Sequence, residues 1–134
     1  MIERHVIRND QDVSIAVVIA QTYARECNFN EDKTQRLGTA VAELARNICK
    51  YSHEKGGDML IQLTKQSHGR SQLKLQFRDN GPGISDITQA LQDHFSTSGT
   101  LGLGLSGVKR MVDHFEIQSL PGDGTVVTIM MDQD

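Results

Sequence analysis

Two polar side chains in a helix-like segment are the first candidates for chemistry. Glu43 and Asn47 are four residues apart, and at about 100° per residue they lie on one face of a helix, one turn apart. A carboxylate there can orient a hydroxyl or accept its proton, and a carboxamide oxygen can ligate Mg²⁺. The pair alone does not exclude the alternative of a solvated helix flank without a function.

A second group follows a predicted strand. Asp79, Gly81 and Gly83 lie around Pro82 in the stretch that begins at Phe77. Glycines on both sides of a proline let the backbone turn sharply and let a flat ligand approach without Cβ clashes. The Asp79 carboxylate could then accept a hydrogen bond from an exocyclic amine such as that of adenine. A plain Gly-Pro turn with an Asx cap is the alternative.

A glycine-rich stretch, residues 96–109, contains the G-x-G-x-x-G spacing at Gly102, Gly104 and Gly107. No apolar strand precedes Gly102, and the motif does not lie in a first βαβ unit, so a nicotinamide site is disfavoured. A Ser/Thr/Gly loop that leads into a helix N-terminus instead favours phosphate, because free N–H groups and the helix dipole attract anions. We expect this loop to act as a lid, with a plain glycine loop and helix cap as the alternative.

The last candidate is Thr125, which follows Gly124 at the start of an apolar strand. Its hydroxyl could lie beside a purine, although threonine is also common in strands without a binding role. Arg46 and Lys50 share the polar side of the segment that carries Glu43, and we interpret them as ordinary surface charges.

Hydrophobic patterns predict the elements that must position these residues. Alternating apolar residues indicate strands, and apolar residues at helical spacing indicate helices, with Asn9 or Asp10 and Asn30 as helix caps. The expected elements are a strand over 2–8, helices over 10–27 and 30–51, a hairpin of strands over 59–64 and 72–77, a helix from Ser106 to about His114, and strands over 115–119 and 125–131.

The order of these elements lacks regular βαβ alternation, so a doubly wound parallel sheet is disfavoured. We expect an α/β (α+β) two-layer sandwich, in which helices cover one face of a mostly antiparallel sheet. Apolar residues of the second helix then form one stripe against the sheet, and Glu43 and Asn47 lie at the border of that stripe.

Length and charge limit the possible functions. A chain of 134 residues is expected to form one domain over 1–134. Its 17 acidic and 14 basic residues disfavour a general nucleic-acid binder. The longest apolar run, residues 15–20, is far shorter than the ~20 residues of a membrane span, and no secretion signal is evident. Cys27 and Cys49 lack metal-ligand spacing, so we expect buried, reduced, structural thiols. We also expect a cytoplasmic protein without nucleic-acid or membrane partners.

The order of the four motifs resembles the GHKL family of ATP-binding domains, which includes histidine kinases, gyrase-type ATPases, Hsp90 and MutL. Glu-x-x-x-Asn on a helix, Asp-x-Gly-x-Gly after a strand, Gly-x-Gly at a helix start and Gly-Thr at the last strand occur in the family's order. The resemblance covers about residues 5–131. It implies the Bergerat fold, an α/β sandwich that binds ATP between a helix layer and a mobile lid.

By position, the resemblance implies a role for each motif residue. Glu43 would be the catalytic base and Asn47 would ligate Mg²⁺. Asp79 would bind the adenine amino group, with Thr125 beside it. The other residues expected to bind ATP, through the adenine pocket, the phosphate-binding amides or the lid, are Gly81, Gly83, Ser98, Thr100, Gly102, Leu103, Gly104 and Leu105.

Length and the stretches 42–48 and 95–110 resemble stand-alone bacterial serine/threonine kinases of the partner-switching type, in particular the RsbT-like switch kinases of the stressosome. This branch implies an RsbS-like STAS-domain antagonist as the protein substrate, a PP2C-type phosphatase (RsbU-like) that is activated by direct binding, and a stressosome scaffold. The alternative is an anti-sigma factor of the RsbW or SpoIIAB type, which sequesters a sigma factor and phosphorylates an anti-anti-sigma protein. A module that binds nucleotide only as a structural ligand is less favoured, because it would not need Glu43.

Overall fold

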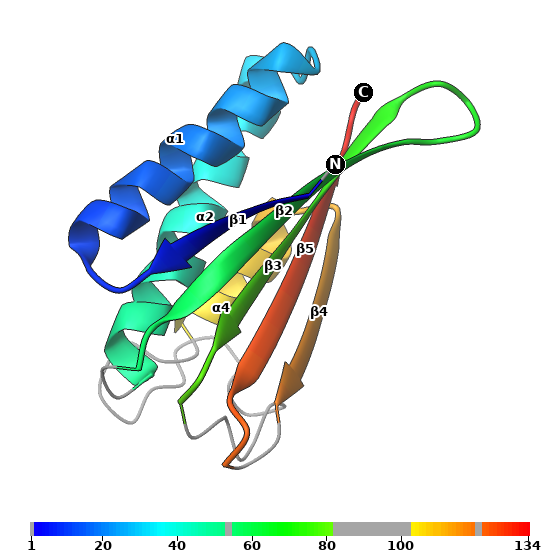
Figure 1. Cartoon of the computed structure of the whole chain (residues 1–134). Coiled ribbons are helices and arrows are strands. Elements are labelled where there is room, and N and C mark those ends of the chain that lie inside the picture. The colour runs from blue at the N-terminus through cyan, green and yellow to red at the C-terminus, as the bar shows by residue number, and fades with distance from the viewer. Residues whose placement is uncertain (1, 53–54, 82–102, 120–121) are drawn as a thin grey trace.

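A five-stranded sheet forms one layer of the molecule, and helices cover one of its faces (Figure 1). The computed structural model describes residues 2–52, 55–81, 103–119 and 122–134. The strand order is β1-β2-β3-β5-β4, with every neighbouring pair antiparallel. The elements are β1 (Ile2–Ile7), α1 (Asp10–Glu26), α2 (Glu31–Tyr51), β2 (Gly57–Lys65), β3 (Ser71–Asp79), α4 (Leu103–Met111), β4 (His114–Ser119) and β5 (Thr125–Asp132).

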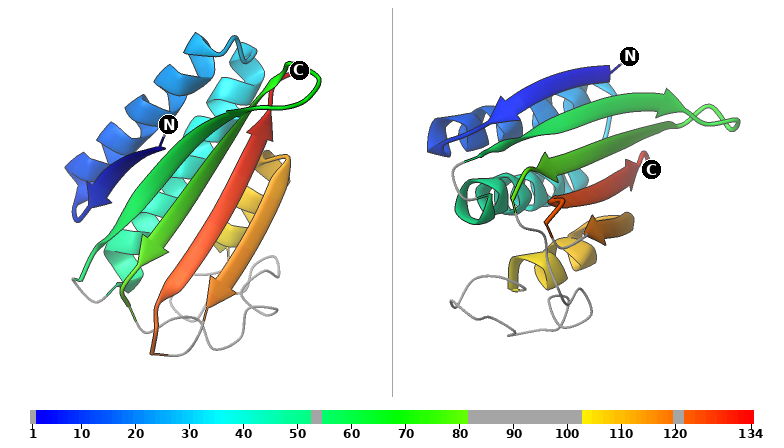
Figure 2. Two further views of the ribbon diagram at one scale, coloured as in Figure 1. Left: turned by 45° about the vertical axis from the view of Figure 1, so that its right-hand side comes forward. Right: turned by 60° about the horizontal axis from the view of Figure 1, so that its bottom comes forward.

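The expected fold class is confirmed. Views from two further sides show α1, α2 and α4 on the same side of the sheet, and none of the described helices covers the other face (Figure 2). Two of the four adjacent strand pairs, β2–β3 and β4–β5, are consecutive in the chain, and every pair is antiparallel, which is why the sequence lacks a βαβ rhythm. No helix that the structure describes is long and apolar enough to cross a membrane.

The two long helices begin at the predicted asparagine caps. Asn9 Oδ1 accepts a hydrogen bond from the Asp12 N–H at 3.0 Å, and Asn30 Oδ1 accepts one from the Lys33 N–H at 2.8 Å. Each bond satisfies one of the N–H groups that a helix start leaves without an intrahelical acceptor. The caps therefore fix where α2 begins, and with it the position of every side chain further along that helix.

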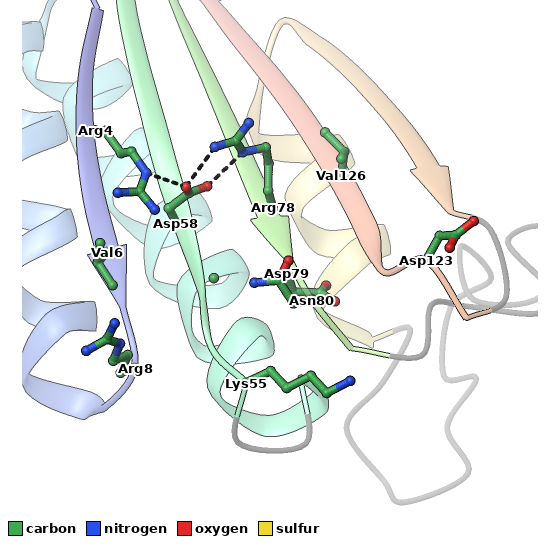
Figure 3. A pocket seen from close by; sticks show the side chains of 11 residues that line it. Arg4, Val6, Arg8, Lys55, Asp58, Arg78, Asp79, Asn80, Asp123 and Val126 are labelled. Atoms are coloured by element: carbon green, nitrogen blue, oxygen red, sulfur yellow. Dashed lines mark hydrogen bonds and ion pairs between the residues drawn. The ribbon is translucent and has the colours of Figure 1, made fainter.

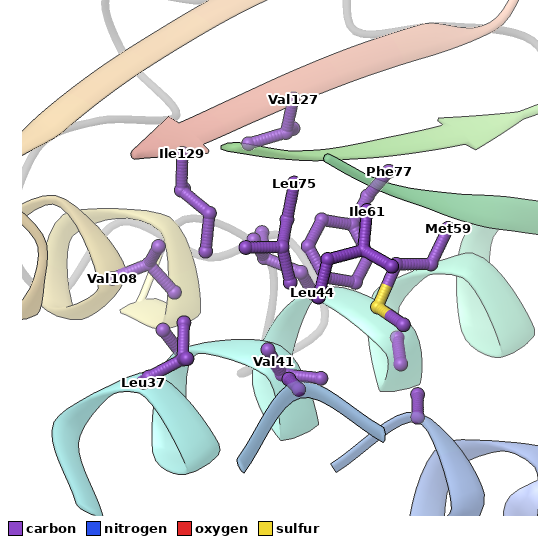
Figure 4. Packing of buried hydrophobic residues seen from close by; sticks show 14 of the residues in the cluster. Leu37, Val41, Leu44, Met59, Ile61, Leu75, Phe77, Val108, Val127 and Ile129 are labelled. Carbon is purple, nitrogen blue, oxygen red and sulfur yellow. The ribbon is translucent and has the colours of Figure 1, made fainter. Parts of the chain in front are cut away.

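The hydrophobic core lies between α2 and the sheet (Figure 4). Alternate residues of β2, β3 and β5 face the helices, as the period of two requires. Full burial of one such aliphatic side chain contributes about 1.5–3 kcal/mol. Buried side chains at this interface include Leu37, Val41, Leu44, Met59, Ile61, Leu75, Phe77, Ile129 and Met131. Because α2 is fixed on the sheet by this stripe, Glu43 and Asn47 lie half-buried at its edge.

Helix α4 differs from its predicted bounds. The sequence predicted a helix from Ser106 to about His114, whereas α4 begins at Leu103 and ends at Met111. Glycine disfavours a helix interior, but Leu105 and Val108 are 2% and 0% exposed, and their burial outweighs that cost. At the other end, the Asp113 N–H donates to the Met130 carbonyl at 3.2 Å, so the chain pairs with β5 directly after the helix.

The two cysteines form no disulfide with each other, but they are less buried than the sequence predicted. Cys27 and Cys49 are free and partly buried. Burial raises the pKa of both thiols, which lowers the fraction of reactive thiolate. Both therefore act as small core-edge side chains.

Candidate active site

Glu43 and Asn47 of α2 face the first turn of α4. A methyl group built on Gly104 would lie 3.0 Å from Glu43 Oε2 and 3.7 Å from Asn47 Nδ2. The backbone of α4 therefore passes close to both side chains, and glycine at 104 is what leaves room between them. The structure brings together three residues from two separate sequence motifs.

A cavity of about 250 Å³ opens beside this contact. Its walls include Thr39 and Glu43 from α2, and Val108 and Met111 from α4. The cavity therefore lies between the two helices and has the Glu43 carboxylate in one wall.

The N-terminal turn of α4 offers backbone donors opposite the α2 side chains. Leu103, Gly104 and Leu105 form this turn, and the first N–H groups of a helix have no intrahelical acceptor. The helix dipole adds partial positive charge there, and no acidic residue occupies the turn. Because the Leu105 side chain is buried, its contribution to a bound anion would come from its backbone.

Glu43 forms an ion pair that the sequence analysis missed. Arg46 Nη1 lies 3.1 Å from Glu43 Oε1, and both side chains remain partly exposed, at 45% for Arg46 and 38% for Glu43. An exposed pair of this kind contributes at most about 1 kcal/mol, so the carboxylate can leave it for a substrate. The i, i+3 spacing of the two residues was the signal that could have predicted this contact.

Asp79 ends β3 at the other side of the site, and its register partner in β5 is Thr125. The Gly81 N–H donates to Asp79 Oδ1 at 2.8 Å. Burial raises the pKa of Asp79, and the backbone hydrogen bonds from Gly81 and Thr125 oppose that rise. A carboxylate has about four lone-pair sites, so Asp79 keeps capacity for a further donor.

Close backbone approaches shape the space around Asp79. A methyl group on Gly81 would overlap the carbonyl oxygen of Tyr51, and one on Gly124 would overlap the carbonyl oxygen of Asp79. Gly124 also has a φ of 82°, which side chains other than glycine rarely tolerate. These glycines let the end of α2, the end of β3 and the start of β5 meet at one carboxylate.

The Thr125 hydroxyl has a neighbour that the sequence analysis did not single out. Ser119 Oγ lies 3.1 Å from Thr125 Oγ1, and Ser119 Oγ also donates to the Gly124 carbonyl at 3.3 Å. The two residues are register partners in β4 and β5. Because a turn fixes how the strands on either side of it align, the turn at 120–124 could have predicted that these two residues lie opposite each other.

Several expected site residues lie outside the described residues. These are Gly83, Ser98, Thr100 and Gly102, together with most of the segment expected to be the lid. Leu103 is described as part of α4, and its expected role concerns its backbone.

The chain is similar in sequence to a family of ATPases, to a serine/threonine-protein kinase and to an anti-sigma factor. The sequence model described as "Histidine kinase-, DNA gyrase B-, and HSP90-like ATPase" matches residues 32–134. The serine/threonine-protein kinase RsbT of Bacillus subtilis (strain 168) is 40% identical over 121 residues, which cover 90% of this chain and 89% of that protein. An anti-sigma F factor of Thermoanaerobacter sp. (strain X514) is 28% identical over 131 residues, covering 95% and 90%.

Solved structures share the fold at low identity. The structure of the RsbU and RsbW domains of Rv1364c from Mycobacterium tuberculosis aligns with a TM-score of 0.66 and 11% identity, over 100% of this chain and 33% of that one. The mycobacterial sensor histidine kinase MprB aligns with a TM-score of 0.61 and 20% identity, over 99% and 98%. The chain thus spans a third of the first structure and nearly all of the second.

Proposed function

Since the chain belongs to the histidine kinase-, DNA gyrase B- and HSP90-like ATPases and, within them, to the RsbT-like serine/threonine-protein kinases, we propose that it transfers the γ-phosphate of ATP to a hydroxyl of a STAS-domain antagonist protein. The observation that carries this proposal is the contact of Glu43 and Asn47 with the first turn of α4. A carboxylate, a carboxamide and a helix N-terminus there form a set suited to phosphoryl transfer.

In this proposal, the adenine ring binds at the Asp79 end of the site. The Asp79 carboxylate accepts a hydrogen bond from the adenine amino group, and Thr125 lies beside the ring. The approach of Gly81 to the end of α2 supports a flat pocket there. The phosphates then extend toward the backbone amides of Gly104 and Leu105, where the α4 dipole favours their charge.

The residues present suit a magnesium ion that is held mainly by the nucleotide. No group of three or more His, Cys, Asp or Glu side chains that could hold a metal occurs in the parts of the chain that the structure describes. Mg²⁺ in kinase sites uses few protein ligands together with phosphate oxygens and water, so the Asn47 carboxamide oxygen is a sufficient protein ligand. When bound, the ion neutralises charge on the phosphates.

Glu43 is the proposed base. As the substrate oxygen forms its bond to the γ-phosphorus, the bond from that phosphorus to the β,γ-bridging oxygen breaks and ADP leaves. The hydroxyl proton passes to the Glu43 carboxylate. Because the transition state of phosphoryl transfer is loose, the main contribution of Glu43 is to orient the hydroxyl.

The partner proteins are proposed from the relatives that the chain resembles in sequence. A partner-switching kinase of the RsbT type would release its STAS-domain antagonist and activate a PP2C-type phosphatase by direct binding, with a stressosome scaffold as the site of release. The similarity to an anti-sigma F factor supports a second candidate function, in which the chain also sequesters a sigma factor.

The proposal is tested by incubating the protein with Mg-ATP and a purified RsbS-like STAS-domain protein and measuring the intact mass of the latter. We expect one added phosphate with the wild type and with the control Glu26→Gln, which alters an exposed carboxylate at the end of α1. Glu43→Gln should abolish the addition. ATP binding without any phosphate transfer would refute the kinase assignment, and capture of a sigma factor would then favour the second candidate.

A further inference from the structure

The sheet face opposite the described helices carries a hollow (Figure 3). Of the side chains to which the proposed kinase chemistry gives a role, Asp79 alone is among its lining residues. Its volume is about 460 Å³, and it lies over the ends of the strands that approach Asp79. Four cationic side chains line it, from β1, the turn after β1, the segment before β2, and β3. These are Arg4, Arg8, Lys55 and Arg78.

Two of the four cations are organised by a buried carboxylate. Asp58 is 5% exposed and accepts hydrogen bonds from Arg78 Nε and Nη2, both at 2.8 Å, and from Arg4 Nε at 2.6 Å. The Arg78 hydrogen bond and, after it, that from Arg4 hold the pKa of Asp58 below its ordinary value despite its burial. Each guanidinium has five N–H donors, so both keep donors that Asp58 does not use. Asp58 thus fixes the two groups in place without satisfying them.

The other two cations are not neutralised by any residue that the structure describes. Neither Arg8 nor Lys55 forms an ion pair within that part of the chain, and both are exposed. The aliphatic part of Arg8 lies over Gly56, since its Cγ is 3.2 Å from a methyl group built there. Three acidic residues, Asp58, Asp79 and Asp123, also line the hollow, so its four cationic residues exceed them by one.

The shape of the hollow distinguishes between possible anionic ligands. Its lining residues come from β1, β2, β3 and β5, which are adjacent strands, so it extends over three strand spacings, or about 14 Å. That is too wide for a single phosphate and matches about four residues of extended chain. Arg4 and Arg78 converge on Asp58, and Arg8 and Lys55 line the hollow without bonding to that carboxylate, so an extended occupant meets cationic groups at more than one point.

We propose that this hollow is a docking site for an acidic, extended segment of a partner protein. Carboxylates of the segment pair with Arg8 and Lys55 and with the free donors of Arg4 and Arg78. The hollow lies on the face of the sheet away from α2 and α4 (Figures 2 and 3), so it does not include Glu43 or Asn47, and it borders the candidate site at Asp79.

The test uses fluorescein-labelled hexaglutamate as the probe and fluorescence anisotropy at about 50 mM salt, where charge pairs are weakly screened. The variant Arg8→Gln/Lys55→Gln removes the two unpaired cations. The matched control Lys65→Gln/Arg70→Gln removes one lysine and one arginine at the exposed β2–β3 hairpin, at the opposite end of these strands. We expect the first variant to weaken binding at least about fivefold and the control to leave it unchanged.

Equal weakening by both variants would show non-specific charge attraction and overturn the proposal, as would failure of the wild type to bind the probe. Light scattering tests whether a second copy of the chain occupies the hollow instead. A wild-type dimer that dissociates in the Arg8→Gln/Lys55→Gln variant would assign the face to a second copy of the chain and overturn the proposal. Unchanged ATP affinity and thermal unfolding of both variants are expected, so the result does not depend on the kinase assignment.

Discussion

Replacing Gly104 by alanine should make the protein more stable and, at the same time, slow phosphoryl transfer. Alanine is favoured over glycine in a helix by about 1 kcal/mol, and α4 contains residue 104 in its first turn. The added methyl would lie 3.0 Å from Glu43 Oε2, so that carboxylate must move by a few tenths of an ångström. The end of a partly exposed side chain can do so at low cost, and we expect the melting temperature to rise by about 2–4 °C.

The same displacement should slow phosphoryl transfer. A catalytic group misplaced by about 1 Å costs about 10²-fold in rate, so a shift of a few tenths of an ångström should lower the rate of phosphate addition to the STAS-domain protein about three- to tenfold. The rate is measured by intact mass over time at saturating Mg-ATP, and ATP affinity is measured separately by calorimetry.

Gly107 of the same helix supplies the matched control. A methyl group on Gly107 meets nothing within 4 Å, so Gly107→Ala should give a similar gain in stability with an unchanged rate. If Gly104→Ala slows transfer no more than Gly107→Ala does, the contact between α4 and Glu43 has no part in the chemistry, and the reasoning fails.

Three further predictions concern single side chains. Asp79→Asn replaces the acceptor proposed for the adenine amino group and should weaken ATP binding by ~1–3 kcal/mol; equal affinity by titration calorimetry would contradict that role. Asn30→Ala removes the α2 cap and should lower the free energy of unfolding by about 1 kcal/mol, which urea unfolding measures; an unchanged midpoint would show that water replaces the cap. Because the folded-state pKa of Asp58 is lowered, its ion pairs stabilise the fold above its ordinary pKa, and this stabilisation is lost as the pH falls through the lowered value. Melting temperatures from neutral pH to about pH 3 should therefore fall more steeply for the wild type than for Asp58→Asn, and parallel curves would refute the assignment.

Local patterns were sufficient to predict most of the fold. The period of two in β2 and β3 and the helical stripe of α2 reflect burial on one face, so the amphipathic pattern and the asparagine caps together indicate each element. The exception is the start of α4, where Gly104 and Gly107 argue against a helix. Its first turn is stabilised by burial of Leu105, which is a tertiary effect that no local pattern encodes.

The candidate site was predicted residue by residue but not as an arrangement. The resemblance to a family pointed to Glu43, Asn47 and Asp79, yet the contacts around them come from packing between distant segments. The approach of Gly104 to Glu43 joins positions 61 residues apart in the chain. Ser119 lies beside Thr125 because of the β4–β5 register, and the alternation of apolar residues within each strand does not specify how two strands align.

Arg78 and Asp79 are consecutive in β3 and therefore point to opposite faces of the sheet. One peptide unit thus joins a guanidinium of the outer hollow to the carboxylate proposed to bind adenine, and the β2 backbone pairs with both residues. Thermodynamic linkage makes any coupling across this unit symmetric. If bound nucleotide changes the affinity of the outer face for an acidic segment by some factor, that segment changes the affinity for nucleotide by the same factor. The coupling can then be measured either as the change in affinity for the acidic segment or as the change in affinity for nucleotide.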